Sequence, residues 1–136
     1  MLWEASWHNR KVADSNPAPG YKKYPNHRIV TTPAKARVRV SFSGQLIADT
    51  QDAVVLEENG YSPVYYLPRA DVMMDALVRS SHRTHCPFKG DASYFSVKDG
   101  PENAVWSYET PYDETMAIKD RLAFYRDKVS IDVARE

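Results

Sequence analysis

The sequence predicts one mainly β domain, and three observations support this prediction. Short runs of alternating apolar and polar residues recur along the chain, as expected for half-buried strands. Gly-containing turns separate these runs, and only one helical pattern interrupts them, which favours antiparallel sheets over βαβ units. With 136 residues and 43% hydrophobic residues, the chain is long enough for one domain with a single hydrophobic core, and two domains are not expected at this length.

The first strands follow one another across tight turns. Ser43-Gly44 and Glu58-Asn59-Gly60 are typical turn sequences that reverse the chain between strands. The runs around these turns predict an antiparallel meander. The expected strands cover residues 37–42, 45–49, 53–57 and 64–67.

One α-helix is expected after this meander. Pro68 suits the first turn of a helix, and Asp71 would lie near the positive end of the helix dipole. On this helix one face would hold Val72, Met73, Ala76 and Leu77, and the helix would end near Ser80.

A hairpin with aromatic side chains is expected next. Residues 92–97 and 103–108 are strand-like runs joined by Lys98-Asp99-Gly100-Pro101-Glu102. Alternation places Tyr94 on one face of the first strand, and Trp106 and Tyr108 on one face of the second. Aromatic side chains would therefore line one surface of this hairpin.

The C-terminal residues predict a turn and a closing hairpin. Residues 111–119 suit a loop or a short helical turn. Residues 122–125 and 129–133 are apolar runs on either side of Arg126-Asp127-Lys128, and they are expected to pair with each other.

The N-terminal residues 1–27 predict a flexible basic arm, followed by the domain at residues 28–136. Prolines are frequent up to Pro33, so no regular structure is expected before about residue 34. Through Arg39, eight Lys and Arg residues against two acids give 8 − 2 = +6. The arm would fold back on the acidic body or contact an anionic partner. Trp3 and Trp7, at helical spacing, would dock on the body or on another subunit of a homo-oligomer.

The composition bounds the location and partners of the protein. The formal net charge is zero, which argues against a nucleic-acid partner that requires many neutralised phosphates. No apolar run has the length of a membrane span, so no membrane partner is expected. The chain has one cysteine and no secretory signal pattern, which favours the cytoplasm.

The segment Thr84-His85-Cys86-Pro87-Phe88-Lys89-Gly90 is the strongest indication of a site. A turn built on Pro87 and Gly90 would hold the thiol of Cys86 near the ammonium of Lys89, which favours the reactive thiolate. The alternatives are an inert buried cysteine and a solvated lysine. No metal site is expected, because zinc needs more ligands than this segment offers.

The motifs in their order along the chain resemble the domain-of-unknown-function family 427. They cover roughly residues 27 to 133: Arg37-Val38, Phe42-x-Gly44, Ala48-Asp49, Glu57, Tyr65-Tyr66-x-Pro68-x-x-Asp71-Val72, Thr84-x-Cys86-Pro87-x-Lys89-Gly90-x-Ala92-x-Tyr94, Asn103, Trp106-Ser107-Tyr108 and Ala123-Phe124-Tyr125. The resemblance implies a β-tent, a pair of antiparallel sheets meeting at an angle, with the predicted helix inserted.

The family also carries a nucleotidyltransferase label in some classifications. Metal-dependent nucleotidyl transfer needs carboxylates gathered on a divalent cation, commonly from an Asp-x-Asp after a Gly-Ser turn. Neither pattern occurs in this chain. A family label by itself does not establish an activity.

In a β-tent, the concave side between the sheets is the natural pocket. An aromatic pocket with one cation and one carboxylate suits a small polar or anionic molecule, with Lys89 meeting an anionic group and Glu57 accepting hydrogen bonds. The alternative is a packed aromatic core with an internal Glu57–Lys89 ion pair. The candidate ligand-binding residues are Glu57, Tyr66, Lys89, Tyr94, Trp106 and Tyr108.

Two other functions remain open at this point. An enzyme would use Cys86 as a nucleophile or redox thiol, or Lys89 as a Schiff-base amine, with His82 or His85 as a partner base. An interaction module would use the N-terminal arm. The residues identify no cofactor and leave open whether the protein is an enzyme.

Overall fold

The computed structural model describes residues 15–135, and within them ten strands form three antiparallel sheets. The predicted mainly β class with antiparallel sheets is confirmed. The first sheet has the order β1 (Ile29–Pro33), β4 (Val54–Glu58), β5 (Val64–Tyr66); the second has β10 (Ser130–Arg135), β2 (Ala36–Phe42), β3 (Gln45–Thr50); the third has β6 (Leu77–Cys86), β7 (Gly90–Val97), β8 (Val105–Tyr108), β9 (Ala123–Phe124).

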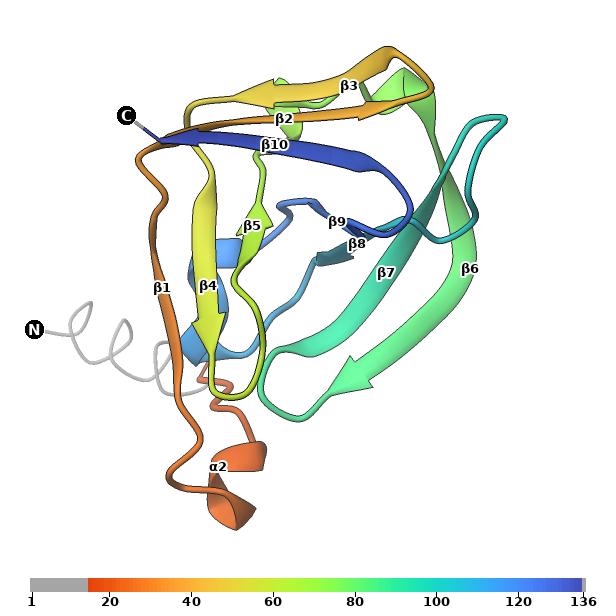
Figure 1. The fold of residues 1–136 in the computed structure, drawn as a ribbon. Helices are drawn as coiled ribbons and strands as arrows, with labels where there is room; N and C mark the ends of the chain where they lie inside the picture. The colour runs from red at the N-terminus through yellow and green to blue at the C-terminus, as the bar shows by residue number, and fades with distance from the viewer. Residues whose placement is uncertain (1–14, 136) are drawn as a thin grey trace, which may run out of the picture.

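One bent ribbon connects the first two sheets. Two residues separate β1 from β2, and Lys35 there has a positive φ of 49°. Across the bend, the Ala34 amide donates to the Ala53 carbonyl at 2.9 Å, so the ribbon stays paired from one sheet into the next. Figure 1 shows β2, β3 and β10 lying across one end of β1, β4 and β5. The resemblance implied a pair of sheets meeting at an angle, and hydrogen bonding divides the strands among three.

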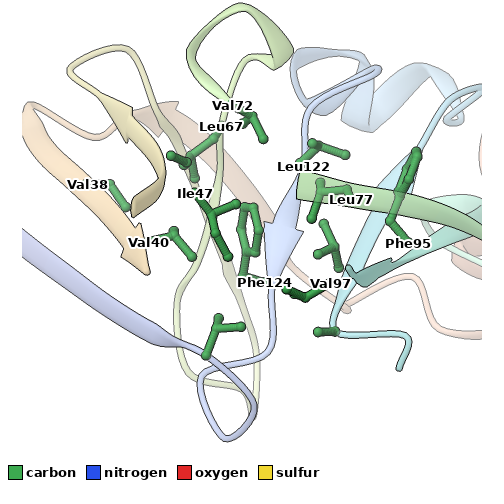
Figure 2. Packing of buried hydrophobic residues seen from close by; sticks show 14 of the residues in the cluster. Val38, Val40, Ile47, Leu67, Val72, Leu77, Phe95, Val97, Leu122 and Phe124 are labelled. Atoms are coloured by element: carbon green, nitrogen blue, oxygen red, sulfur yellow. The ribbon is translucent and has the colours of Figure 1, made fainter. Parts of the chain in front are cut away.

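The main core lies where the sheets face one another. Val40 and Ile47 come from β2 and β3, Val97 comes from β7 and Phe124 comes from β9, and all four pack in one buried cluster (Figure 2). Burying an aliphatic or aromatic side chain of this size contributes about 1.5 to 3 kcal/mol. The core therefore holds together sheets that share few backbone hydrogen bonds.

The predicted helix between Pro68 and Ser80 is wrong. The chain instead makes two 3-10 turns, Arg69–Asp71 and Met74–Ala76, and β6 begins at Leu77. The backbone of this segment pairs with β3: Val72 forms a β-bridge with Ala48, and the Met73 amide donates to the Ile47 carbonyl at 2.8 Å. Tertiary pairing outweighs the weak local helical preference.

The predicted hairpin between residues 122–125 and 129–133 is also wrong. β9 pairs with β8, whereas β10 pairs with β2 in another sheet. Each of these strands completes the edge of a different sheet, and this pairing is invisible to local alternation. The other predicted strands are present within two residues of their expected ends, and residues 113–118 form the expected helical turn.

Regular structure also begins earlier than predicted. β1 occupies residues 29–33 and the four-residue helix α2 (Gly20–Lys23) precedes it, although no regular structure was expected before about residue 34. The strand forms because its backbone pairs with β4 along its whole length, and Pro33 lies at its last position. None of the helices within residues 15–135 is long and apolar enough to cross a membrane.

Glu109 links the 3-10 turn Arg69–Asp71 to strand β6 of the third sheet. Its carboxylate accepts hydrogen bonds from Arg69 at 2.8 Å and from Arg79 of β6 at 3.1 and 2.8 Å. The Arg79 hydrogen bond, with that of Arg69, lowers the pKa of Glu109 to about 2. The carboxylate is therefore charged in the folded protein over most of the acidic range.

We predict that Glu109→Gln lowers the free energy of unfolding by about 1 to 2 kcal/mol at pH 7. The folded pKa lies below the ordinary value of 4.5, so the contribution is present above that pH and is lost as the pH falls toward 2. Urea denaturation of both proteins should show the difference closing over that window. Glu102→Gln, at an exposed position, is the control. A constant difference down to pH 2 would contradict this role of the charge.

Candidate functional site

A cavity of about 470 Å³ lies where β4 and β5 face the third sheet. This volume lies within the range of about 300 to 1,000 Å³ found for small-molecule sites. Its wall consists mainly of aromatic side chains, with a few charged and polar ones. The lining residues are His27, Leu56, Glu58, Tyr61, Ser62, Val64, Tyr66, Cys86, Pro87, Phe88, Lys89, Tyr94, Trp106, Tyr108 and Tyr125.

Strand register gathers the predicted aromatic residues at this cavity. Tyr94 of β7 lies opposite Trp106 of β8, and Ala92 lies opposite Tyr108, so all four side chains share one face. Tyr66 reaches the same cavity from β5. Five of the six predicted ligand-binding residues line the cavity, and they are Tyr66, Lys89, Tyr94, Trp106 and Tyr108.

Glu57 does not line the cavity. It is exposed and lines a surface groove beside Arg28; its neighbour Glu58 borders that groove and also lines the cavity. Successive strand residues point to opposite faces, and Leu56, which is buried, shares its face with Glu58. The position of Glu58 two residues after the apolar Leu56 was the signal that could have identified it in the sequence.

Glu58 binds two basic side chains at one end of the cavity. Lys89 Nζ donates to Glu58 Oε1 at 2.5 Å, and His27 Nε2 donates to Glu58 Oε2 at 2.7 Å. The exposed fractions of the Lys89, Glu58 and His27 side chains are 12%, 9% and 18%. Lys89 is therefore not a free cation, since a carboxylate compensates its charge within the cavity. The internal ion pair considered for Lys89 exists, with Glu58 as the partner in place of Glu57.

A tight turn between β6 and β7 positions Lys89. The Lys89 amide donates to the Cys86 carbonyl at 3.3 Å, and Gly90 adopts a φ of +112°, a left-handed conformation that side chains disfavour. A Cβ atom at Gly90 would also lie 3.2 Å from the Thr110 carbonyl oxygen. The glycine therefore allows the chain to reverse directly after the lysine.

The aromatic wall is held by hydrogen bonds and ring contacts. Trp106 Nε1 donates to the Tyr66 hydroxyl at 3.3 Å, and the Tyr125 ring lies 4.5 Å from the Trp106 ring. Burial raises the pKa of Tyr66 and of Tyr108 above the ordinary value of 10.0. Burial, and then the Tyr94 hydroxyl, raises the pKa of Tyr125 to about 12. These phenols stay protonated at neutral pH and keep a hydrogen to donate.

Cys86 also lines the cavity and is half-buried, but the two histidines near it in sequence do not line it. His82 is exposed with its ring 4.5 Å from the Tyr94 ring, and exposed His85 is hydrogen-bonded to Asp91 at 2.7 Å. The histidine of the cavity is His27, which sequence analysis assigned to the arm.

Residues 15–27, named the strap here, are the described part of the predicted arm, and they contact both the body and the cavity. The Asn16 amide donates to Asp113 at 2.8 Å, and the Ala18 amide donates to Glu114 at 2.8 Å. Near its other end, His27 stacks on the Phe88 ring at 4.1 Å while it binds Glu58. The strap therefore folds back on the body. Trp3 and Trp7 lie outside the described residues.

Within residues 15–135, no three or more His, Cys, Asp or Glu side chains gather closely enough to hold a metal ion. A family profile described as Domain of unknown function (DUF427) matches residues 30–135, in agreement with the resemblance seen in the motifs. The matched residues include every cavity residue except His27. A comparison with curated proteins found no match.

We predict that Glu58→Gln destabilises the protein by about 1 to 3 kcal/mol, because it leaves the Lys89 ammonium buried without its counter-charge. Glu57→Gln is the matched control on the same strand and should change the free energy of unfolding by less than about 0.5 kcal/mol. Urea denaturation at pH 7 measures both. Equal effects of the two substitutions would contradict the distinction between the faces of β4.

We predict that Gly20→Ala loosens the strap. A Cβ atom there would lie 2.7 Å from the Phe88 ring and 2.9 Å from the Pro87 carbonyl oxygen, which also accepts the Gly20 amide hydrogen bond. Overpacking of this kind costs about 1 to 3 kcal/mol. Hydrogen–deuterium exchange of the strap peptide should accelerate in Gly20→Ala and stay unchanged in the exposed control Lys22→Ala. Unchanged exchange in both variants would contradict the prediction, because it would show that the Phe88 ring moves aside to accommodate the methyl group.

Proposed function

Because the chain belongs to the family described as Domain of unknown function (DUF427), which assigns no activity, we propose from the cavity itself that the protein binds a small polar molecule there. One observation carries the proposal. A single cavity of ligand size contains the Lys89–Glu58 ion pair at one end and aromatic walls around Trp106.

The charges of the cavity select the kind of polar ligand. Lys89 offers an ammonium donor and Glu58 a carboxylate acceptor, and their charges compensate each other. A ligand with both an acceptor and a donor can meet the two groups together. A simple anion would approach Lys89 only beside the Glu58 carboxylate, which repels it. Of the polar and anionic molecules expected from the sequence, neutral or zwitterionic ones are therefore favoured.

The walls favour a flat group in the ligand. Trp106, Tyr108 and Tyr125 offer ring surfaces, and an aromatic contact contributes about 0.5 to 1.5 kcal/mol beyond the area that it buries. The rings pack on one another and on the strands, so binding would immobilise few additional side chains. A planar polar molecule, such as an aromatic amide or a nucleobase, fits both features.

Thiol chemistry at Cys86 is a second candidate, because Cys86 lines the same cavity as Lys89 and His27. Both basic groups are hydrogen-bonded to Glu58, so a reaction would require one of them to leave that partner. The interaction role proposed for the arm now depends on residues 1–14, outside the described part of the chain, because residues 15–27 contact the body.

We predict that planar neutral or zwitterionic probes raise the melting temperature of the protein. Nicotinamide, benzamide, nucleosides and free aromatic amino acids are suitable, with inorganic phosphate and sugar phosphates as anionic comparisons. A ligand at a hundred times its dissociation constant stabilises by about 2.7 kcal/mol, which shifts the melting temperature by several degrees. Lys89→Met should weaken binding at least tenfold by calorimetry, since Glu58 then lacks its partner and one donor is lost.

The controls separate binding from stability. Lys98→Met removes an exposed lysine outside the cavity and should bind as the unmodified protein does. The double variant Glu58→Gln with Lys89→Met removes both charges, so it should recover stability without recovering affinity. Cys86→Ser should bind normally if the thiol only forms the wall. Unchanged affinity in Lys89→Met would remove the ion pair from the ligand site, and binding of the anionic probes alone would reverse the proposed charge preference.

A further inference from the structure

A second cavity of about 240 Å³ adjoins the first. It lies between β2 and β10 on one side and β5 and β9 on the other, with Val40, Leu67, Phe124 and Ile131 in its wall. The two cavities share four lining residues, which are Ser62, Val64, Trp106 and Tyr125. These shared residues place the two cavities next to each other.

The two cavities differ in chemistry. Glu58, Lys89 and His27 line the first and not the second. The wall of the second is mainly aliphatic and aromatic, and its charged members, Arg126 and Asp127, are exposed residues of the loop after β9. An apolar group is therefore disfavoured beside the ion pair of the first cavity and favoured in the second.

The size of the second cavity is that of a ligand group. Protein interiors are close-packed and contain few voids larger than a water molecule. An apolar cavity of about 150 Å³ is known to stay dry and to take up benzene. The second cavity is larger than that, so it has room for a short alkyl chain or a ring.

We propose that the second cavity binds the apolar tail of the ligand whose polar head lies beside Lys89 and Glu58. The ligand is thus an amphipathic molecule with a head that donates and accepts hydrogen bonds, a flat middle against Trp106 and Tyr125, and a short uncharged tail. This inference rests on the proposed function of the first cavity, and it adds the class of molecule that the whole site selects.

The test uses 4-alkylbenzamides with tails from hydrogen to butyl, and isothermal calorimetry on the full chain. Each methylene buried in the second cavity should tighten binding by about fourfold. 4-(2-Hydroxyethyl)benzamide has the size of 4-propylbenzamide but a polar tail end, and it should gain far less than the propyl compound.

Ile131→Phe should fill the second cavity and remove the gain with tail length, while benzamide itself binds unchanged. Ile131→Leu keeps the volume of the side chain and is the matched control, so it should keep the gain. If Ile131→Phe lowers the melting temperature strongly, Pro63→Phe at an exposed lining position narrows the same cavity and should give the same result.

The outcomes distinguish the two proposals. If benzamide binds but longer tails give no gain, the tail site is overturned and the polar-ligand site stands. If the gain persists in both Ile131→Phe and Pro63→Phe, the tail lies elsewhere and the tail site is again overturned. If no member of the series binds, the ligand class assigned to both cavities is overturned together.

Discussion

The buried ion pair between Glu58 and Lys89 is the constraint on which the site depends. It joins β4 of the first sheet to the turn before β7 in the third, and His27 adds the strap to the same carboxylate. A carboxylate with so little exposure is tolerated only when its oxygens have partners, and here each oxygen has one. The pair therefore fixes the distance between the two walls of the cavity at the end where polar groups are needed.

The rest of the fold sets the position of these walls. The bent ribbon of β1 to β4 turns one sheet across another, and the main core fills the angle near β2 and β3 (Figures 1 and 2). A second buried cluster includes Tyr66, Tyr94 and Tyr108, and these three side chains also line the first cavity. Large rigid rings on strands cannot collapse to close such a space, so the cavity is a consequence of the residue types at these positions.

The chemistry of the site follows from this combination of rigid walls and compensated charge. Membership of the DUF427 family describes the domain without assigning it a reaction, so the residues of the cavity carry the functional argument. A paired lysine and glutamate offer complementary hydrogen-bonding groups without a net charge, which favours neutral heads over anions. The adjoining apolar cavity would accept the apolar part of the same ligand, so that the polar and apolar parts of one molecule would each meet a matching environment.

The sequence by itself determined the mainly β class, most of the strands and the turn at Lys89, and five of the six residues that it proposed for binding line the cavity. Alternation and turn residues act locally, so they are readable without the fold. Only the tertiary structure decided what depends on distant partners. Residues 68–80 form no α-helix, because their backbone pairs with β3 and β7. Residues 129–133 pair with β2, and His27 of the predicted arm binds Glu58. These contacts join segments far apart in the chain, where local patterns carry no information about the partner.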